Sequence, residues 1–203
     1  MRVLAVTGSP RRAGNTSFLI DEVLARLQDA GMETEHVSLS GHLLAGCIGC
    51  GECGKTRDLR CALVDDGFND LLAKTIEADG IVLGSPVCWG GMASAMKAFV
   101  ERAGSVSAAC GGVLHQKVGA AVVAVRRSGA LSAFDSINHL FLTSGMIVVG
   151  STYWNVGIGR YAGDVANDAE GLDTMRNLGD SMAHVLLCLR GREETGRARE
   201  DEQ

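Results

Sequence analysis

Residues 2–17 read RVLAVTGSPRRAGNTS, which places an apolar run, a glycine-rich turn and the start of a helix in direct succession. The run from Arg2 to Thr7 ends at Gly8 and predicts a short buried strand. The segment 15–30 predicts a helix, because four apolar side chains fall on one stripe: Leu19, Val23, Leu24 and Leu27. A strand that passes through such a turn into a helix is typical of the first unit of an α/β fold.

The rest of the chain continues this alternation. Apolar runs predict strands at 80–87, 117–125 and 146–152, and a weakly alternating segment predicts a strand at 33–39. Amphipathic segments predict helices at 67–78, 92–103, 131–144 and 172–189. Strands that are apolar throughout require a parallel sheet covered on both faces. The expected class is therefore α/β, with a five-stranded doubly wound parallel sheet that binds its ligand at the carboxyl ends of the strands.

Composition limits the classes of protein that remain. The 203 residues include 27 glycines, 2 prolines and 7 cysteines and carry a net charge of -5. A disordered chain and a coiled coil are excluded, and the mild negative charge argues against nucleic-acid binding. The sequence contains no apolar run of membrane-spanning length, so we expect no membrane association. Its first residues lack the layout of a secretory signal, which predicts a cytoplasmic protein whose cysteines serve as ligands or catalysts.

The turn at residues 8–17 has the features of a phosphate site. A helix N-terminus offers unpaired N–H groups and the positive end of a dipole, and glycine lets the backbone approach an anion closely. Hydroxyl, amide and guanidinium groups crowd the same turn: Ser9, Arg11, Arg12, Asn15, Thr16 and Ser17. The second strand ends in Ser38-Leu39-Ser40, without the acidic residue that holds an adenosine ribose. The pattern favours a mononucleotide, although the polar side chains would also serve as helix caps.

Two further loops follow predicted strands. Both prolines of the chain come after a Gly-Ser pair, and the second continues as Pro86-Val87-Cys88-Trp89-Gly90-Gly91. Glycine beside apolar residues can lay backbone N–H groups against a planar ligand. The next loop reads Arg126-Arg127-Ser128-Gly129, and an arginine there would stabilise negative charge on a reduced flavin ring. The alternative is that both arginines are solvated loop charges.

These loops together resemble the flavodoxin-like NAD(P)H-dependent FMN reductase family. The signatures are Gly-Ser-Pro-Arg…Gly-Asn-Thr-Ser and Ser-Pro-Val-Cys-Trp-Gly-Gly-Met…Met-Lys. The resemblance implies that the first loop binds the FMN phosphate through Ser9, Arg11, Asn15, Thr16 and Ser17. It implies that the isoalloxazine ring is flanked by Pro86, Val87, Cys88, Trp89 and Gly90, and that Arg127, Ser128 and Gly129 close on its edge. Cys88 stands where relatives often carry an aromatic residue, and it is either a thiol near the flavin or a small buried filler.

A compact cysteine motif lies between the second strand and the second helix. Cys47, Cys50, Cys53 and Cys61 follow the spacing C-x2-C-x2-C-x7-C, in which three thiolates can converge on one metal centre. Zinc prefers two separated C-x2-C knuckles, so it fits this run less well, and a redox pair of thiols is a further alternative. In flavodoxin-like proteins the motif resembles that of the iron–sulfur flavoproteins, which implies a [4Fe–4S] cluster held by all four cysteines.

The resemblance implies a single flavodoxin-like FMN-binding domain at 1–190 with a cysteine-rich loop at 41–66, and we expect a disordered charged tail at 191–203. It implies an FMN-dependent oxidoreductase that passes electrons from NAD(P)H or a ferredoxin-like donor to a quinone, a flavin or an oxygen species. Cys110 and Cys188 receive no role. The alternatives are an electron carrier without substrate turnover and a cysteine-based redox sensor. Relatives are commonly dimers or tetramers, and we expect the stretch at Tyr153-Trp154 to pack at a contact between copies.

Overall fold

The computed structural model describes residues 1–201, and side chains up to residue 191. Five parallel strands form the body of one sheet in the order β2-β1-β3-β5-β6. Their bounds are β1 Arg2–Thr7, β2 Glu33–Ser38, β3 Gly80–Cys88, β5 Val118–Val125 and β6 Ile147–Val148. Two short strands extend the sheet: β4 (Gly91–Met92) pairs antiparallel with β3, and β7 (Val156–Ile158) pairs parallel with β5. The expected α/β class and five-stranded parallel core are confirmed.

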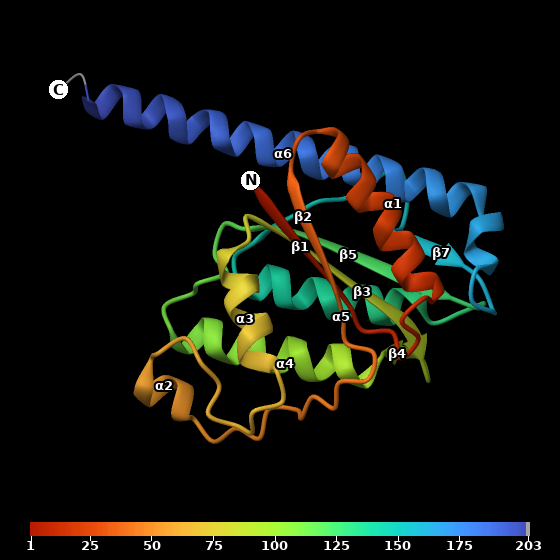
Figure 1. Ribbon diagram of the computed structural model, residues 1–203, viewed down its shortest axis with the longest axis horizontal. Coiled ribbons are helices and arrows are strands. Elements are labelled where there is room, and N and C mark those ends of the chain that lie inside the picture. The colour runs from red at the N-terminus through yellow and green to blue at the C-terminus, as the bar shows by residue number, and fades with distance from the viewer. Residues whose placement is uncertain (202–203) are drawn as a thin grey trace.

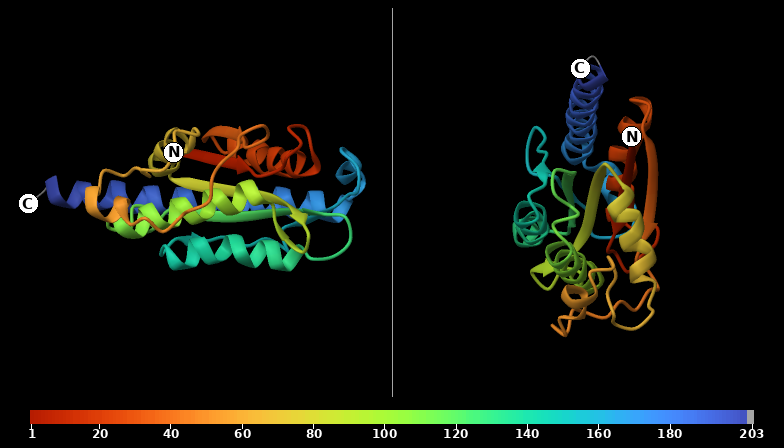
Figure 2. Two further views of the ribbon diagram at one scale, coloured as in Figure 1. Left: turned by 90° about the horizontal axis from the view of Figure 1, so that it is seen from below. Right: turned by 90° about the vertical axis from the view of Figure 1, so that its left-hand side faces the viewer.

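Helices cover both faces of the sheet, as Figures 1 and 2 show. On one face, α1 (Asn15–Asp29) and α6 (Ala169–Asp201) lie side by side and bury leucines, valines and methionines against alternate residues of the strands. On the other face lie α3 (Phe68–Glu77), α4 (Ser94–Ala109) and α5 (Ala130–Thr143), which form a second core. In β1, β3 and β5 most side chains on both faces are buried, which explains why these three strands are apolar. The edge strand β2 is only partly buried and carries polar residues.

The last strand differs from the expectation for residues 146–152. β6 contains two residues, and the chain then leaves the sheet and returns as β7 beside the second half of β5. The excursion is held by Asn155, which is buried, accepts a hydrogen bond from the Val123 N–H at its backbone carbonyl, and accepts another from Ser151 Oγ at Oδ1. Side-chain hydrogen bonding of this kind competes with the strand ladder, and residue periodicity alone does not reveal it.

The C-terminal helix is longer than the sequence led us to expect. α6 continues past residue 190, across most of the segment for which we expected a disordered tail, to Asp201. Glutamate and arginine are the commonest residues of that segment, and both are good helix formers without needing an apolar stripe. The last two residues of that expectation, 202–203, lie outside the described residues. None of the helices in residues 1–201 is both long enough and apolar enough to cross a membrane.

Candidate functional site

The N-terminus of α1 has the features of an anion-binding site. Gly14 precedes the helix without a side-chain cap, and the first turn contains no acidic residue. The N–H groups at the start of α1 and the positive end of its dipole therefore have no capping side chain and no carboxylate in that turn. Thr16 Oγ1 is buried and has no hydrogen-bond partner in the described part of the chain. An unpaired buried hydroxyl is costly, and a bound phosphate oxygen would satisfy it.

A cleft of about 240 Å³ opens beside this helix end, at the carboxyl ends of β1, β3 and β5. Its walls come from the first loop, from the end of β3 and from two segments near β5. The residues that line it are Ser9, Pro10, Arg11, Gly14, Asn15, Thr16, Pro86, Val87, Cys88, Ala124, Arg126, Gly159 and Arg160. A polar, cationic end and an apolar end therefore meet in one cleft, as a mononucleotide with a flat ring requires.

Two residues of the expected phosphate set use their side chains elsewhere. Asn15 Oδ1 accepts a hydrogen bond from Gly163 N, and Ser17 Oγ donates to the Arg12 carbonyl. Their backbone N–H groups still belong to the first turn of α1. The side chain of Ser17 therefore braces the loop, while that of Asn15 both lines the cleft and holds the segment that follows β7.

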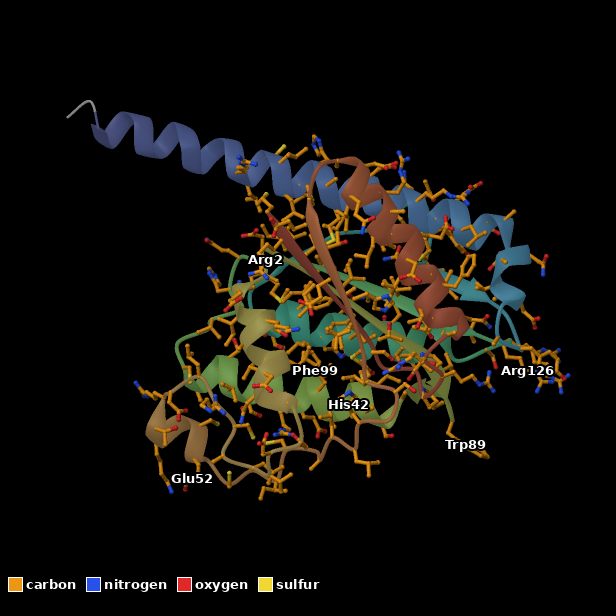
Figure 3. All side chains as sticks on the ribbon, viewed as in Figure 1. Arg2, His42, Glu52, Trp89, Phe99 and Arg126 are labelled. Carbon is orange, nitrogen blue, oxygen red and sulfur yellow. The ribbon has the colours of Figure 1, made fainter. Side chains whose placement is uncertain are left out.

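The second and third loops approach each other closely at the mouth of the cleft. Gly129 has φ +88, and a Cβ added there would lie 3.1 Å from Val87 Cγ1 and 3.3 Å from Gly90 Cα. Trp89 has φ +48 and is fully exposed, and its ring points away from the body of the protein, as Figure 3 shows. The expected ring-flanking loop is thus present, but its aromatic side chain does not line the cleft.

The arginines of the third loop divide between two places. Arg126 lines the cleft, whereas Arg127 lines a neighbouring pocket of about 200 Å³ with Leu131, Tyr153 and Trp154. Of the residues expected to contact FMN, Ser17, Trp89, Gly90, Arg127, Ser128 and Gly129 do not line the cleft. Gly159 and Arg160 line it although the sequence analysis did not include them. They follow β7, which was not predicted, and no motif distinguishes them.

All four cysteines of the compact motif line one small pocket, of about 20 Å³, below α4. The motif is carried by the loop after β2 and by the short helix α2 (Glu52–Thr56), and every cysteine is a free thiol. The described residues hold no group of three or more His, Cys, Asp or Glu side chains already arranged to hold a metal ion. The donor set fits a soft metal centre, but the loop must adjust for the four sulfurs to converge. The exposure of Cys47 and Cys50 leaves room for that.

Hydrogen bonds attach the cysteine loop to α4. Ser105 Oγ donates to Cys47 Sγ at 3.5 Å, and Arg102 Nε donates to Cys61 Sγ at 3.4 Å. Burial raises the pKa of the Cys53 thiol, which lies near Cys110. A fifth cysteine therefore borders the motif, because Cys110 Sγ lies 3.8 Å from the Cys53 carbonyl oxygen.

Asp66 fastens three elements together at the edge of this pocket. Its carboxylate accepts hydrogen bonds from Ala45 N in the loop, from Phe68 N at the start of α3, and from Arg102 Nη1 of α4 at 2.6 Å. Burial by itself would raise the pKa of Asp66, but these hydrogen bonds, that of Arg102 first, hold the pKa below its usual value. Asp66 therefore caps the start of α3 and also ties the cysteine loop to α4.

Arg102 is the clearest residue that sequence reasoning missed. It lies one turn after Ala98 and Phe99, on the apolar spacing of α4, and a charge on such a stripe was the available signal. The cysteine pocket and the phosphate cleft share no lining residue. They lie at opposite ends of the molecule, as Glu52 near one and Trp89 and Arg126 near the other mark in Figure 3.

A parallel sheet with a cationic mononucleotide cleft at the carboxyl ends of its strands defines a flavodoxin-like protein. Comparison with solved structures agrees for the fold. RosB with bound 8-demethyl-8-formylriboflavin-5'-phosphate superposes with a TM-score of 0.70 at 18% identity, covering all of this chain and 88% of that one. A flavodoxin from the domain Archaea gives a TM-score of 0.60 at 18% identity, covering 92% of this chain and 99% of the other.

Sequence comparison identifies the family. The family model described as NADPH-dependent FMN reductase matches residues 1–160. An iron-sulfur flavoprotein of Methanocaldococcus jannaschii is 39% identical over 94% of this chain and 100% of its own length. An iron-sulfur flavoprotein of Methanosarcina thermophila is 30% identical over 92% of this chain and 95% of its own. The chain belongs to the FMN reductase family, an FMN-binding oxidoreductase family, and within it to the iron–sulfur flavoprotein branch.

Proposed function

We propose that this protein is an FMN-dependent oxidoreductase with an additional [4Fe–4S] cluster. It passes electrons between NAD(P)H or a ferredoxin-like donor and a small acceptor such as a quinone, a flavin or an oxygen species. The observation that carries the proposal is that Cys47, Cys50, Cys53 and Cys61 share one pocket in a chain whose relatives are named iron-sulfur flavoproteins.

The chain's own groups have definite roles in holding FMN. The N–H groups of the first turn of α1, the Thr16 hydroxyl and the Arg11 guanidinium bind the phosphate. Pro86, Val87 and Cys88 supply an apolar wall for the ring, and Arg126 supplies positive charge at the mouth of the cleft. FMN, when bound, provides the hydride chemistry and the ability to release electrons singly, while the protein provides position and electrostatics.

The cysteine pocket supports a metal centre by its chemistry. Four free thiols within fifteen residues are soft ligands, and the narrow spacing favours a single compact cluster over the two knuckles typical of zinc. Hydrogen bonds from Ser105 and Arg102 to two of the sulfurs give the ligands the outer support that metal sites generally have.

The test is chemical analysis of protein purified without oxygen. We expect a flavin absorption spectrum together with about four iron and four sulfide per chain, the content of one [4Fe–4S] cluster. The variant Cys50→Ala should lose the iron and keep FMN, because no residue lines both sites. Cys188→Ala is the matched control, since that thiol lies on α6 away from the motif, and it should retain both. A flavin spectrum without iron or sulfide, or with stoichiometric zinc, contradicts the cluster.

Steady-state assays separate an enzyme from a carrier. We expect oxidation of NADH or NADPH with a quinone or free FMN as acceptor. Absence of turnover with either nicotinamide or with reduced ferredoxin, combined with fast electron exchange with ferredoxin, would instead identify a flavodoxin-like carrier. Both outcomes leave the FMN site itself in place.

A further inference from the structure

Arg102 is the largest completely buried side chain among residues 1–191, with 0% of its side chain exposed. Removing a guanidinium group from water is costly unless its charge is paired and each N–H has an acceptor. The surroundings of Arg102 must therefore supply a negative charge and hydrogen-bond acceptors. The contacts of the guanidinium group show which of its N–H groups still lacks an acceptor.

The two edges of the guanidinium group face different partners. Nη1 donates to Asp66 Oδ2 at 2.6 Å and lies 3.4 Å from the Ala45 carbonyl oxygen, while the plane of the group stacks on Phe68 with Cζ 4.0 Å from the ring centre. The opposite edge carries Nε and Nη2, the pair that in this same protein binds one carboxylate when Arg26 meets Asp180. On Arg102 that edge has one partner, Cys61 Sγ.

Nη2 is the unsatisfied atom. It is buried and has no hydrogen-bond partner among the groups that the structure describes, whose side chains extend to residue 191. Because Nε and Nη2 share an edge, and Nε points at a thiol of the motif, Nη2 faces the same pocket, which Arg102 lines with all four cysteines. A buried donor of this kind requires an acceptor. The acceptor must lie at the Nε–Nη2 edge of the guanidinium group, where Cys61 Sγ also lies.

We propose that Arg102 is a positioning residue for the iron–sulfur centre, and that its Nε and Nη2 groups donate hydrogen bonds to sulfur and raise the centre's reduction potential. The inference rests on the proposed function, since it requires a cluster at the four cysteines. Hydrogen bonds to sulfur and a nearby positive charge stabilise the more negative, reduced form of a cluster, and this is one of the main ways in which a protein adjusts cluster potentials. Asp66 fixes the opposite edge, so the donors are held in one orientation.

The experiment is a redox titration of the anaerobically purified holoprotein, in which the midpoint potentials of cluster and flavin are followed separately. Arg102→Gln removes the charge and the paired donors, and we expect the cluster potential to become more negative while the FMN potential is unchanged. Arg102→Lys keeps the charge beside Asp66 and loses the Nε–Nη2 edge, so a smaller shift in the same direction is expected. Arg26→Gln is the matched control, because it removes an arginine from an exposed ion pair with Asp180, and neither potential should move.

A second measurement uses the unsubstituted chain and does not depend on variant stability. Protein labelled with ¹⁵N-arginine should show coupling of the reduced cluster to ¹⁵N in pulsed electron paramagnetic resonance, because Arg102 is the arginine that lines the cysteine pocket. Absence of that coupling, or an unchanged cluster potential in iron-loaded Arg102 variants, overturns the role of Arg102 alone. Absence of iron and sulfide in the unsubstituted protein overturns the proposed cluster and this inference with it.

Discussion

The hydroxyl of Thr16 is a single group whose hydrogen-bond partner is expected to be a bound ligand rather than another residue of the chain. It is buried at the N-terminus of α1, lines the cleft and makes no hydrogen bond within the described chain. A buried hydroxyl without a partner lowers the stability of the empty protein, and a ligand that hydrogen-bonds to it offsets that cost.

Thr16→Val should therefore weaken FMN binding without destabilising the apoprotein. Valine has nearly the same shape, and the loss of one hydrogen bond to a charged phosphate costs about 1.5 kcal/mol, or roughly a tenfold increase in Kd. Titration of apoprotein with FMN, followed by quenching of flavin fluorescence, measures the affinity. Thr75→Val is the control, because its hydroxyl is bonded to the Leu71 carbonyl in α3, so stability should fall and FMN affinity should not.

Asp66 is expected to make stability depend on pH. Its folded-state pKa is lowered below 3.8, so its contribution is present at neutral pH and is lost as pH falls through the folded pKa. At pH 7, Asp66→Asn should reduce the free energy of unfolding by about 3 kcal/mol, the cost of breaking a buried ion pair. The difference from the unsubstituted protein should shrink below pH 4 in urea unfolding curves.

The neighbouring carboxylate provides the comparison for this effect. Asp65 is exposed, and at pH 7 Asp65→Asn should have nearly the unfolding free energy of the unsubstituted chain. A constant difference between Asp66→Asn and the unsubstituted protein from pH 7 to pH 3 would count against the assigned pKa direction.

At the level of single residues, the motifs predicted the location of the cleft and of the cysteine pocket better than they predicted which side chains line them. The Gly-Ser-Pro turns and the cysteine spacing located the cleft and the pocket, because backbone turns at strand ends have local sequence signatures. The resemblance selected Arg127 for the ring edge, whereas Arg126 is the arginine of this loop that lines the cleft. Adjacent loop residues point in different directions, and the sequence pattern does not record which one faces the cleft. The role of Arg102 could not be predicted from a motif, because it depends on a tertiary contact with Asp66, thirty-six positions away in the chain.

Among the elements, α4 borders the cysteine pocket at one end and packs tightly against the end of β1 near the other. Gly8, at the end of β1, allows the backbone to approach α4 so closely that an added Cβ would lie 2.5 Å from Met96 Cβ. Met96 lies within α4, and the backbone of Gly8 is held by the hydrogen bond from its N–H to the Gly84 carbonyl, so neither can move away cheaply.

Gly8→Ala should destabilise the protein by about 1–3 kcal/mol, the usual cost of overpacking a core. Chemical denaturation with a two-state fit measures the change. Gly150→Ala is the matched control, because a Cβ at that position would meet no atom within 4 Å, and its unfolding free energy should be nearly unchanged. Equal stability of the two variants would mean that β1 and α4 are not packed as described.

The elements that could be predicted are those with a continuous apolar signal. β1 was predicted to the residue, and the bounds of β3 and β5 to within one residue, because each strand is buried on both faces. The edge of the sheet was predicted less well, since Asn155 and Ser151 interrupt the strand through side-chain hydrogen bonds. α2 was missed because its five residues have no buried face to generate a pattern.

For the whole molecule, the unexplained feature is apolar surface near the carboxyl ends of the strands. Leu131, Tyr153, Trp154 and Ile158 line one pocket there and remain exposed, with Trp154 at 49% and Tyr153 at 66%. Trp154 meets Phe134 edge to face at 6.2 Å, so its ring is held in place rather than free to fold back. Exposed apolar patches on stable proteins mark contact sites, and aromatic residues are enriched where such contacts are strongest.

We expect this patch to pack against a second copy of the chain, giving a homodimer or a homotetramer at micromolar concentration. Light scattering coupled to size-exclusion chromatography measures the mass, and Trp154→Asp should reduce it to that of one chain, because a charge at the centre of an apolar contact loses its hydration. Leu187→Asp is the control, since that leucine is equally exposed but lies on α6, and it should leave the mass unchanged. Neither substitution touches the phosphate cleft, so both variants should still bind FMN. A single-chain mass for the unsubstituted protein at micromolar concentration would refute the assembly, and the patch would then be open to the electron donor or acceptor.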